Sequence, residues 1–293
     1  MRSCFSKNSI LLVIALYGLV RFCASDRHHT GHDLTHREEP SSALFFNECT
    51  GQVYKDAVHI DEPFACWCSC SAVPREKMGT FNKREFASCP DGSVERHRFL
   101  CHLLATKSYS KLSRVLFVAP DPSAFDFITN AFPHVDVVGG YKYIAGSFVP
   151  NVTHPMFYFD LTSMPFPNDF FDIVIVQHVL EHIEDDMQAL REISRIIRSG
   201  GQALLEVPIN APGHETIEHL EGVSTASDRL QAYGQKDHVR RYGSDFYDRV
   251  RAVGFDVNVI QYKDHFKRHL PFEMPFQNKE ILSGTSMCIA DKL

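Results

Sequence analysis

Short apolar runs alternate with amphipathic helical patterns from Arg114 to the end of the chain, and this alternation restricts the possible folds more than any other feature. Successive strands that are joined by helices pair in parallel, because the helix carries the chain back to the starting edge of the sheet. The run 173–177 is apolar on both faces, as expected of a central strand that helices cover on both sides. We therefore predict an α/β fold with a doubly wound, Rossmann-like, mainly parallel sheet.

The individual elements follow from apolar runs, capping residues and glycines. Strands are expected at 114–119, 135–138, 156–159, 173–177, 203–207, 256–261 and 286–290. Helices are expected at 93–104, 185–198 and 244–253. Ser93 is the expected N-cap of the first helix, and Gly200 and Gly201 are expected to stop the second. The sequence shows no internal repeat.

Polar and small residues follow the first, third and fourth predicted strands. In an open α/β sheet, ligands bind beyond the carboxyl ends of the strands, where the strand order reverses. An aspartate after the third strand can accept a hydrogen bond from an adenine amino group, and the other two loops can enclose a sugar and an amino-acid tail. The expected ligand is thus a nucleoside. The residues at these positions are Pro120, Asp121, Pro122, Ser123, Asp160, Leu161, His178, Val179, Leu180, Glu181 and His182.

Three separated segments resemble one known family. From Asp160 to Pro208 the chain reads DLTSMPFPNDFFDIVIVQHVLEHIEDDMQALREISRIIRSGGQALLEVP, which resembles the methyltransferase type 11 group of class I S-adenosylmethionine-dependent methyltransferases. The segments CPDGSVERHRFLCHLL and GQKDHVRRYGSDFYDRVRAVGF are similar to a subgroup with a cysteine-bearing N-terminal segment. The resemblance extends over about 66–293. It implies a methyltransferase that uses S-adenosylmethionine, and it leaves the methyl acceptor, a small molecule or a protein, unidentified.

The resemblance also assigns cofactor-binding roles to residues of this chain. Asp160 and Leu161 are expected beside the adenine ring, and Gln177, His178 and Val179 are expected to line the pocket after the fourth strand. The loop 119–123 is expected to approach the methionine part of the cofactor.

This loop departs from the family pattern. It reads APDPS, so that Ala119, Asp121 and Ser123 stand where the family has glycines, which take positive φ at low cost. The loop also lacks the GxGxxG motif that a nicotinamide dehydrogenase needs for its pyrophosphate. No acidic residue marks the end of the second strand, so the residue that contacts the ribose is unassigned.

Four ionisable residues near the predicted pocket are candidates for proton transfer. Methyl transfer needs in-line positioning above all, and a base is needed when the nucleophile is weak. His178 and His182 are the favoured catalytic residues, with Glu181 and His238 as further candidates. Packing at the start of the helix is the alternative role for Glu181 and His182.

Cysteines are concentrated before the predicted α/β domain. The segment 45–111 is expected to form a small cysteine-rich subdomain and a linking helix, ahead of the methyltransferase domain at 112–293. Disulfides are favoured in an oxidising compartment, and their pairing cannot be read from the sequence. No metal is predicted. The alternative is a structural zinc site formed by members of the set Cys49, Cys66, Cys68, Cys70 and Cys89.

The N-terminus has the pattern of a secretory signal. Arg2 and Lys7 precede an apolar run at 10–20, and small residues follow at 23–25. A cleaved signal peptide at 1–25 and a polar, flexible tether at 26–44 are therefore expected, which predicts a secreted or secretory-pathway protein. An uncleaved signal that tethers the protein to a membrane is the alternative. The triplet Asn151-Val152-Thr153 is an acceptor pattern for N-glycosylation.

The charge balance disfavours nucleic acid as a partner. The formal net charge is −6, and acidic and basic residues are interspersed, so the chain has no basic region of the kind that binds phosphate backbones. No later segment has the length of apolar sequence that a membrane span requires. Two alternatives to an enzyme stay open: a methyltransferase-like binding protein without activity, and a secreted interaction protein organised by the cysteine-rich segment.

Overall fold

The computed structural model describes residues 49, 52, 64–81, 84–105, 114–141, 156–209, 215–262 and 286–293. The predicted signal peptide at 1–25, the tether at 26–44 and the glycosylation triplet at 151–153 lie outside the described residues.

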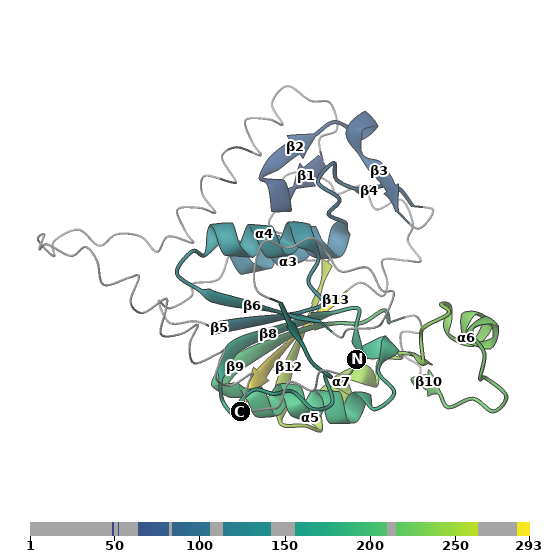
Figure 1. Ribbon diagram of the computed structural model, residues 1–293. Helices are drawn as coiled ribbons and strands as arrows, with labels where there is room; N and C mark the ends of the chain where they lie inside the picture. Colours follow the sequence, from purple (N-terminus) through teal and green to yellow (C-terminus); the bar gives the residue numbers. More distant parts are fainter. Residues whose placement is uncertain are drawn as a thin grey trace, which may run out of the picture.

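A seven-stranded sheet forms the centre of the molecule (Figure 1), in the order β12-β13-β9-β8-β5-β6-β7. All seven predicted strands are present, with ends that shift by a few residues. Only β13 runs antiparallel to its neighbours, so the prediction of a mainly parallel sheet is confirmed. The strands are β5 (Arg114–Val118), β6 (Asp136–Tyr141), β7 (Met156–Tyr158), β8 (Phe171–Gln177), β9 (Ile197–Glu206), β12 (Phe255–Gln261) and β13 (Ser286–Lys292).

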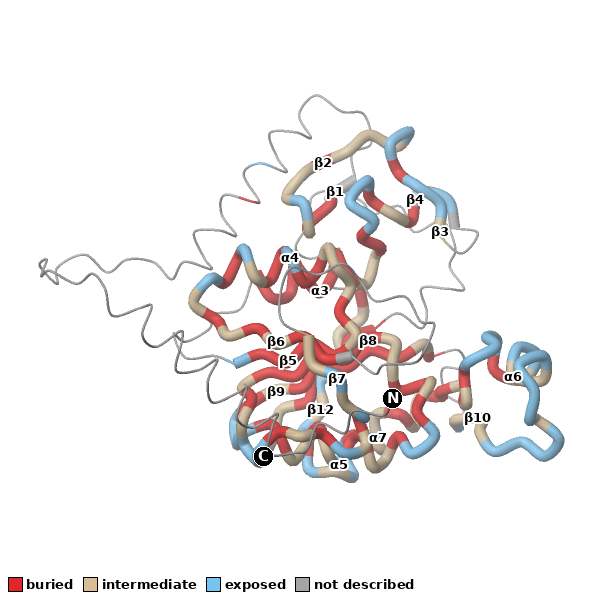
Figure 2. The backbone as a smooth tube through the Cα atoms, in the orientation of Figure 1, coloured by how far each residue is buried: buried red, intermediate tan, exposed pale blue. Residues whose placement is uncertain are grey.

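Helices cover both faces of the sheet. Figure 1 shows α3 (Glu95–Ala105) and α4 (Pro122–Ala131) on one face, with α5 (Asp186–Ile196) and α7 (Phe246–Arg251) on the other. Alternate residues of β8 enter the two cores: Ile173 and Ile175 pack with α3 and α4, whereas Val174 and Val176 pack with α5. The buried strands between exposed outer surfaces are visible in Figure 2. This double burial explains why β8 is apolar along its whole length.

Two predicted helix boundaries are wrong. Ser93 does not cap α3, because its hydroxyl is buried without a hydrogen-bond partner, and His97 Nδ1 instead lies 3.4 Å from the Val94 amide. Gly200 and Gly201 do not stop α5, which ends at Ile196. They lie inside β9, where a Cβ on Gly201 would come within 2.8 Å of the Asp172 carbonyl oxygen. Gly201 therefore permits a close backbone approach within the sheet, and Gly200 has a φ of 73°, which favours glycine.

Two short hairpins and two disulfides form the cysteine-rich region. The hairpins are β1 (Phe64–Cys66) with β2 (Ser71–Val73), and β3 (Gly79–Phe81) with β4 (Arg84–Ser88). Disulfides join Cys49 to Cys70 and Cys66 to Cys89. Four of the five cysteines in the alternative zinc set are thus covalently paired and are not thiolate ligands. Cys68 is the member that forms no disulfide.

A small lobe beside the sheet was not predicted. It contains β10 (Ile217–Glu218), paired with β11 (Arg240–Arg241), and α6 (Ala226–Tyr233), which lies far from the sheet and is largely exposed (Figures 1 and 2). Thr225 and Asp228 form a capping box at the start of α6. Across the described ranges, no helix combines the length and apolar character needed to cross a membrane.

Candidate functional site

The strand order reverses between β5 and β8, and the residues that follow these two strands share an unusual conformation. Ala119 and His178 have φ angles of 47° and 53°, in the left-handed region that non-glycine residues rarely occupy. The amide of Ala119 donates to the Gly140 carbonyl at 2.6 Å, and that of His178 donates to the Glu206 carbonyl at 2.9 Å. The chain therefore turns sharply after each of these two strands, at the ligand-binding edge of the sheet. Such strained residues occur preferentially at functional sites.

Asp121 is the N-cap of α4. Its Oδ1 accepts hydrogen bonds from the amides of Ser123 at 3.0 Å and Ala124 at 3.4 Å, and His97 Nδ1 lies 3.2 Å away. Burial raises the pKa of the Asp121 carboxyl, although these hydrogen bonds oppose the shift. The neighbouring Pro120 is buried. The structure thus gives Asp121 a structural role at the predicted cofactor loop, and the loop itself lies where it was expected.

Asp160 follows β7 on the same edge of the sheet. Its Oδ1 accepts hydrogen bonds from the Thr162 amide at 2.9 Å and the Thr162 hydroxyl at 2.8 Å, which forms a tight turn. The Asp160 residue is exposed, whereas Leu161 is buried in the core beneath it. Asp160 is therefore both a turn residue and an accessible carboxylate.

His178 lies between two buried carboxylates. Its Nδ1 is 3.3 Å from Glu181 Oε1, and its Nε2 is 3.5 Å from Glu206 Oε1. Burial opposes the charged imidazolium, but hydrogen bonds to Glu181 and Glu206 outweigh it and raise the pKa of His178 to about 9. His178 is thus protonated near neutral pH. A protonated imidazole can position neighbouring groups by its charge, but it cannot accept a proton as a general base.

Gln177 is fixed beside this histidine and keeps one unpaired acceptor. Its Nε2 donates to Glu206 Oε2 at 2.7 Å and to the Arg96 carbonyl at 3.4 Å. Its Oε1 is buried and has no hydrogen-bond partner. The partly buried Val179 continues the same loop. Glu206, which the sequence analysis missed, ends β9, and the rule applied to the other strands would have found it there.

Glu181, His182 and His238 lie together, although 56 residues separate the last two in the sequence. The two imidazole rings pack edge to face with centroids 4.8 Å apart. The Val239 amide donates to the Glu181 carbonyl at 2.9 Å and so holds the two segments together. Burial lowers the pKa of His238. The four residues considered for proton transfer thus form one cluster, in which His182 is about one-third exposed.

Arg240 and Tyr242 support the loop that follows β8. Both are buried, and the Arg240 guanidinium donates to the carbonyls of Leu180 at 3.1 Å and Glu184 at 2.8 Å and also to that of Ile183. The guanidinium therefore fixes the loop that follows β8.

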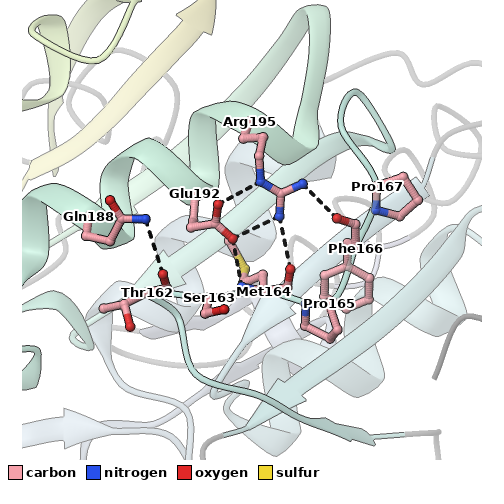
Figure 3. A pocket seen from close by; sticks show the side chains of 9 residues that line it. All are labelled: Thr162, Ser163, Met164, Pro165, Phe166, Pro167, Gln188, Glu192 and Arg195. Carbon is pink, nitrogen blue, oxygen red and sulfur yellow. Dashed lines mark hydrogen bonds and ion pairs between the residues drawn. The ribbon is translucent and has the colours of Figure 1, made fainter. Parts of the chain in front are cut away.

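A hollow of about 400 Å³ lies between α5 and the loop that follows β7 (Figure 3). The polar side chains in it bond to one another and to the backbone: Arg195 pairs with Glu192 at 2.6 Å, and Glu192 accepts from the Met164 amide at 2.7 Å. None of the predicted site residues lines it. Its lining residues are Thr162, Ser163, Met164, Pro165, Phe166, Pro167, Gln188, Glu192 and Arg195.

Comparison with known proteins shows what part of the chain resembles. Residues 134–205 match the family model of a methyltransferase domain. The uncharacterized methyltransferase YcgJ of Bacillus subtilis (strain 168) is 28% identical over 114 residues, which are 38% of this chain and 40% of the relative. An uncharacterized methyltransferase of Mycobacterium sp. (strain KMS) is 30% identical over 140 residues, which are 46% of each chain. The chain therefore spans less than half the length of these curated relatives.

The crystal structure of YcgJ is similar over 67% of this chain and 99% of that one, with 21% identity and a TM-score of 0.42. The family match and the curated relatives confirm the resemblance seen in the sequence. Residues 134–205 thus resemble a methyltransferase domain, as the sequence predicted.

Proposed function

We propose that this protein transfers a methyl group from S-adenosylmethionine to an acceptor that is still to be identified. One observation carries the proposal: the family match over 134–205 contains the loops after β7 and β8, and these loops lie at the ligand-binding edge of the sheet. Asp160, Leu161, Gln177, His178 and Val179 all belong to the matched segment.

The residues at this edge fit the cofactor. The buried Oε1 of Gln177 has no partner and is available to a ligand N–H, such as the ammonium of the methionine moiety. The exposed Asp160 carboxylate can accept hydrogen bonds from the amino group or the sugar hydroxyls of a nucleoside. The bound cofactor supplies an electrophilic methyl on sulfur. Asp160, after β7, and Gln177, at the end of β8, lie on opposite sides of the point where the strand order reverses, and they would hold the two ends of the cofactor.

The same cluster contains a group for proton removal. His178 carries a proton at neutral pH and stabilises the Glu181 and Glu206 carboxylates. His182 is about one-third exposed, and its Nδ1 lies 3.2 Å from the Asp237 carbonyl, an arrangement that favours a proton on Nδ1 and a free lone pair on Nε2. In the metal-free protein, we assign His182 as the base for an acceptor whose nucleophile needs deprotonation.

Titration calorimetry with S-adenosylmethionine and S-adenosylhomocysteine tests the proposal on the purified protein. Binding of both is expected. Asp160→Ala should weaken binding about 10-fold, which corresponds to about 1.4 kcal/mol, while leaving the thermal unfolding midpoint nearly unchanged. Asp126→Ala, an exposed aspartate on α4, is the matched control. Absence of binding by the wild-type protein would rule out the proposed enzyme. Binding without turnover on any acceptor in cell extracts would support the inactive binding protein.

We also propose that the protein passes through the secretory pathway. The two disulfides support this location, since disulfides persist in oxidising compartments. Sequencing the N-terminus of the protein from producing cells tests it. A start near residue 25 is expected, and an intact N-terminus in the membrane fraction would support the tethered alternative. Treatment with a glycosidase shows whether Asn151 is modified.

A further inference from the structure

A carboxylate and two imidazoles converge beside the sheet edge, from two segments that are distant in the sequence. Glu181 and His182 belong to the 3-10 turn η3 (Leu180–His182) after β8, and His238 precedes β11. One donor atom from each residue lies within 4.8 Å of the other two. Donors that share one metal ion at about 2.0–2.2 Å lie up to about 4 Å apart, so a shift of less than about 1 Å completes the arrangement.

Two atoms of this cluster are buried and have no hydrogen-bond partner among the residues that the structure describes. Glu181 Oε2 and His238 Nδ1 both carry lone pairs, and their residues are 1% and 4% exposed. A buried carboxylate oxygen and a buried ring nitrogen normally find a donor. The two unpaired atoms therefore indicate a ligand that accepts electron pairs, because the packing of the protein supplies neither of them with a hydrogen-bond donor.

The remaining polar atoms of the three side chains are fixed by neighbours. Glu181 Oε1 lies 3.3 Å from His178, and His182 Nδ1 lies 3.2 Å from the Asp237 carbonyl oxygen. The His238 ring hydrogen-bonds to the backbone of Tyr233. Metal-binding histidines usually donate their second ring N–H to a carbonyl or a carboxylate, which directs the other nitrogen at the ion.

We propose that Glu181, His182 and His238 bind a divalent first-row transition-metal ion. Two imidazoles and one carboxylate suit ions such as Zn²⁺ and Mn²⁺, and three protein ligands leave coordination positions open. The partial exposure of His182 gives those positions access to solvent. An oxygen ligand bound there has a lowered pKa. An acceptor hydroxyl could be such a ligand, and this part of the inference rests on the proposed function. The metal site itself does not depend on that function.

Metal titration of the whole protein tests the site. The protein is stripped with a chelator and titrated with ZnCl₂ by calorimetry and with MnCl₂ by the loss of the free-ion paramagnetic resonance signal. His182→Ala and His238→Gln should each lose one equivalent of bound ion or weaken its binding at least about 10-fold. His219→Ala is the matched control, because His219 is 73% exposed in the same lobe. Other histidines in the chain can also bind metal, but they are the same in every variant. The difference in metal binding between the wild type and each variant therefore reports on the substituted residue.

The outcomes separate the metal site from the cofactor site. Asp160→Ala should leave metal binding unchanged while it weakens cofactor binding. If the buried His238 variant fails to fold by circular dichroism, the partly exposed His182→Ala variant still decides the question. Wild-type protein that binds neither ion, or variants that bind both ions as the wild type does, would overturn the proposal and leave the cluster as packing at the start of α5.

Discussion

Two buried polar groups of residues lie side by side after β8, and they differ in how completely their atoms are paired. The closed network contains Asp186, Glu218, Arg240, Tyr242 and Arg249. Arg249 bonds to Glu218 at 2.6 Å and to Asp186 at 3.1 Å, Arg240 bonds to Glu218 at 2.8 Å, and the Tyr242 hydroxyl donates to Asp186 at 2.7 Å. Two guanidinium groups thus face two carboxylates.

The open cluster contains Gln177, His178, Glu181, His182 and His238. Three of its buried acceptor atoms, on Gln177, Glu181 and His238, have no hydrogen-bond partner within the described part of the chain. Both groups contain fully buried residues, such as Arg240 in the closed network and Glu181 in the open cluster. Burial alone therefore does not distinguish a structural network from a binding site. A fully paired network stabilises the fold, whereas unpaired acceptors at the ligand-binding edge of a sheet indicate a binding site.

Arg240→Leu should have the largest effect on stability. Arg240 is 1% exposed, and its loss leaves Glu218 with fewer partners and removes the donors to three loop carbonyls. Breaking a buried charge pair on one side costs about 3–5 kcal/mol of unfolding free energy. Urea unfolding measures it. The neighbouring Arg241→Leu, at a half-buried position, should cost less than about 1 kcal/mol. Equal effects of the two substitutions would contradict a structural role for the closed network.

The closed network and His97, which lies near the open cluster, should respond to acid in different pH ranges. Near the open cluster, burial first, and then the charges of Arg96, His178 and Arg98, lower the pKa of His97 well below its usual value. The native state holds His97 neutral while the unfolded state gains a proton below pH about 6.5, so stability is lost as the pH falls from there. In the closed network, burial opposes ionisation of Glu218, but Arg249 and Arg240 lower its pKa. Its contribution is present above pH about 4.5 and is lost as the pH falls further.

Urea midpoints between pH 7.5 and 3.5 measure both losses, each with a slope of at most about 1.4 kcal/mol per pH unit for one group. His97→Asn should flatten the decline below pH about 6.5, and Glu218→Gln should flatten the decline below pH about 4.5. A decline near pH 6.5 that persists unchanged in His97→Asn would show that other histidines cause it.

The sequence predicted the sheet and its ligand-binding edge because both depend on local patterns. The apolar run of β8 records burial on two faces, and residues such as Asp160 and His178 follow their strands directly. The two groups compared above depend on contacts across the chain: 60 residues separate Arg240 from the Leu180 carbonyl that it binds. The contact between His238 and His182 could not be predicted for the same reason, because the two residues are far apart in the sequence. Likewise, the disulfide partners of Cys49 and Cys66 lie 21 and 23 residues away, and several pairings satisfy the same spacing.

The smallest effect is expected for His182→Ala in the open cluster. His182 is about one-third exposed, and its side chain contributes an edge-to-face contact with His238 and a hydrogen bond at the Asp237 carbonyl. Without added metal, the substitution should change the free energy of unfolding by no more than about 0.5 kcal/mol, because His182 is partly exposed and its neighbour Asp237, with Oδ2 3.3 Å from Nδ1, is 70% exposed. Added Zn²⁺ should raise the unfolding midpoint of the wild-type protein but not that of the variant, because an ion stabilises only a native state that binds it. A loss of several kcal/mol in the metal-free variant would instead place His182 with the closed network, as a residue that holds the loop after β8.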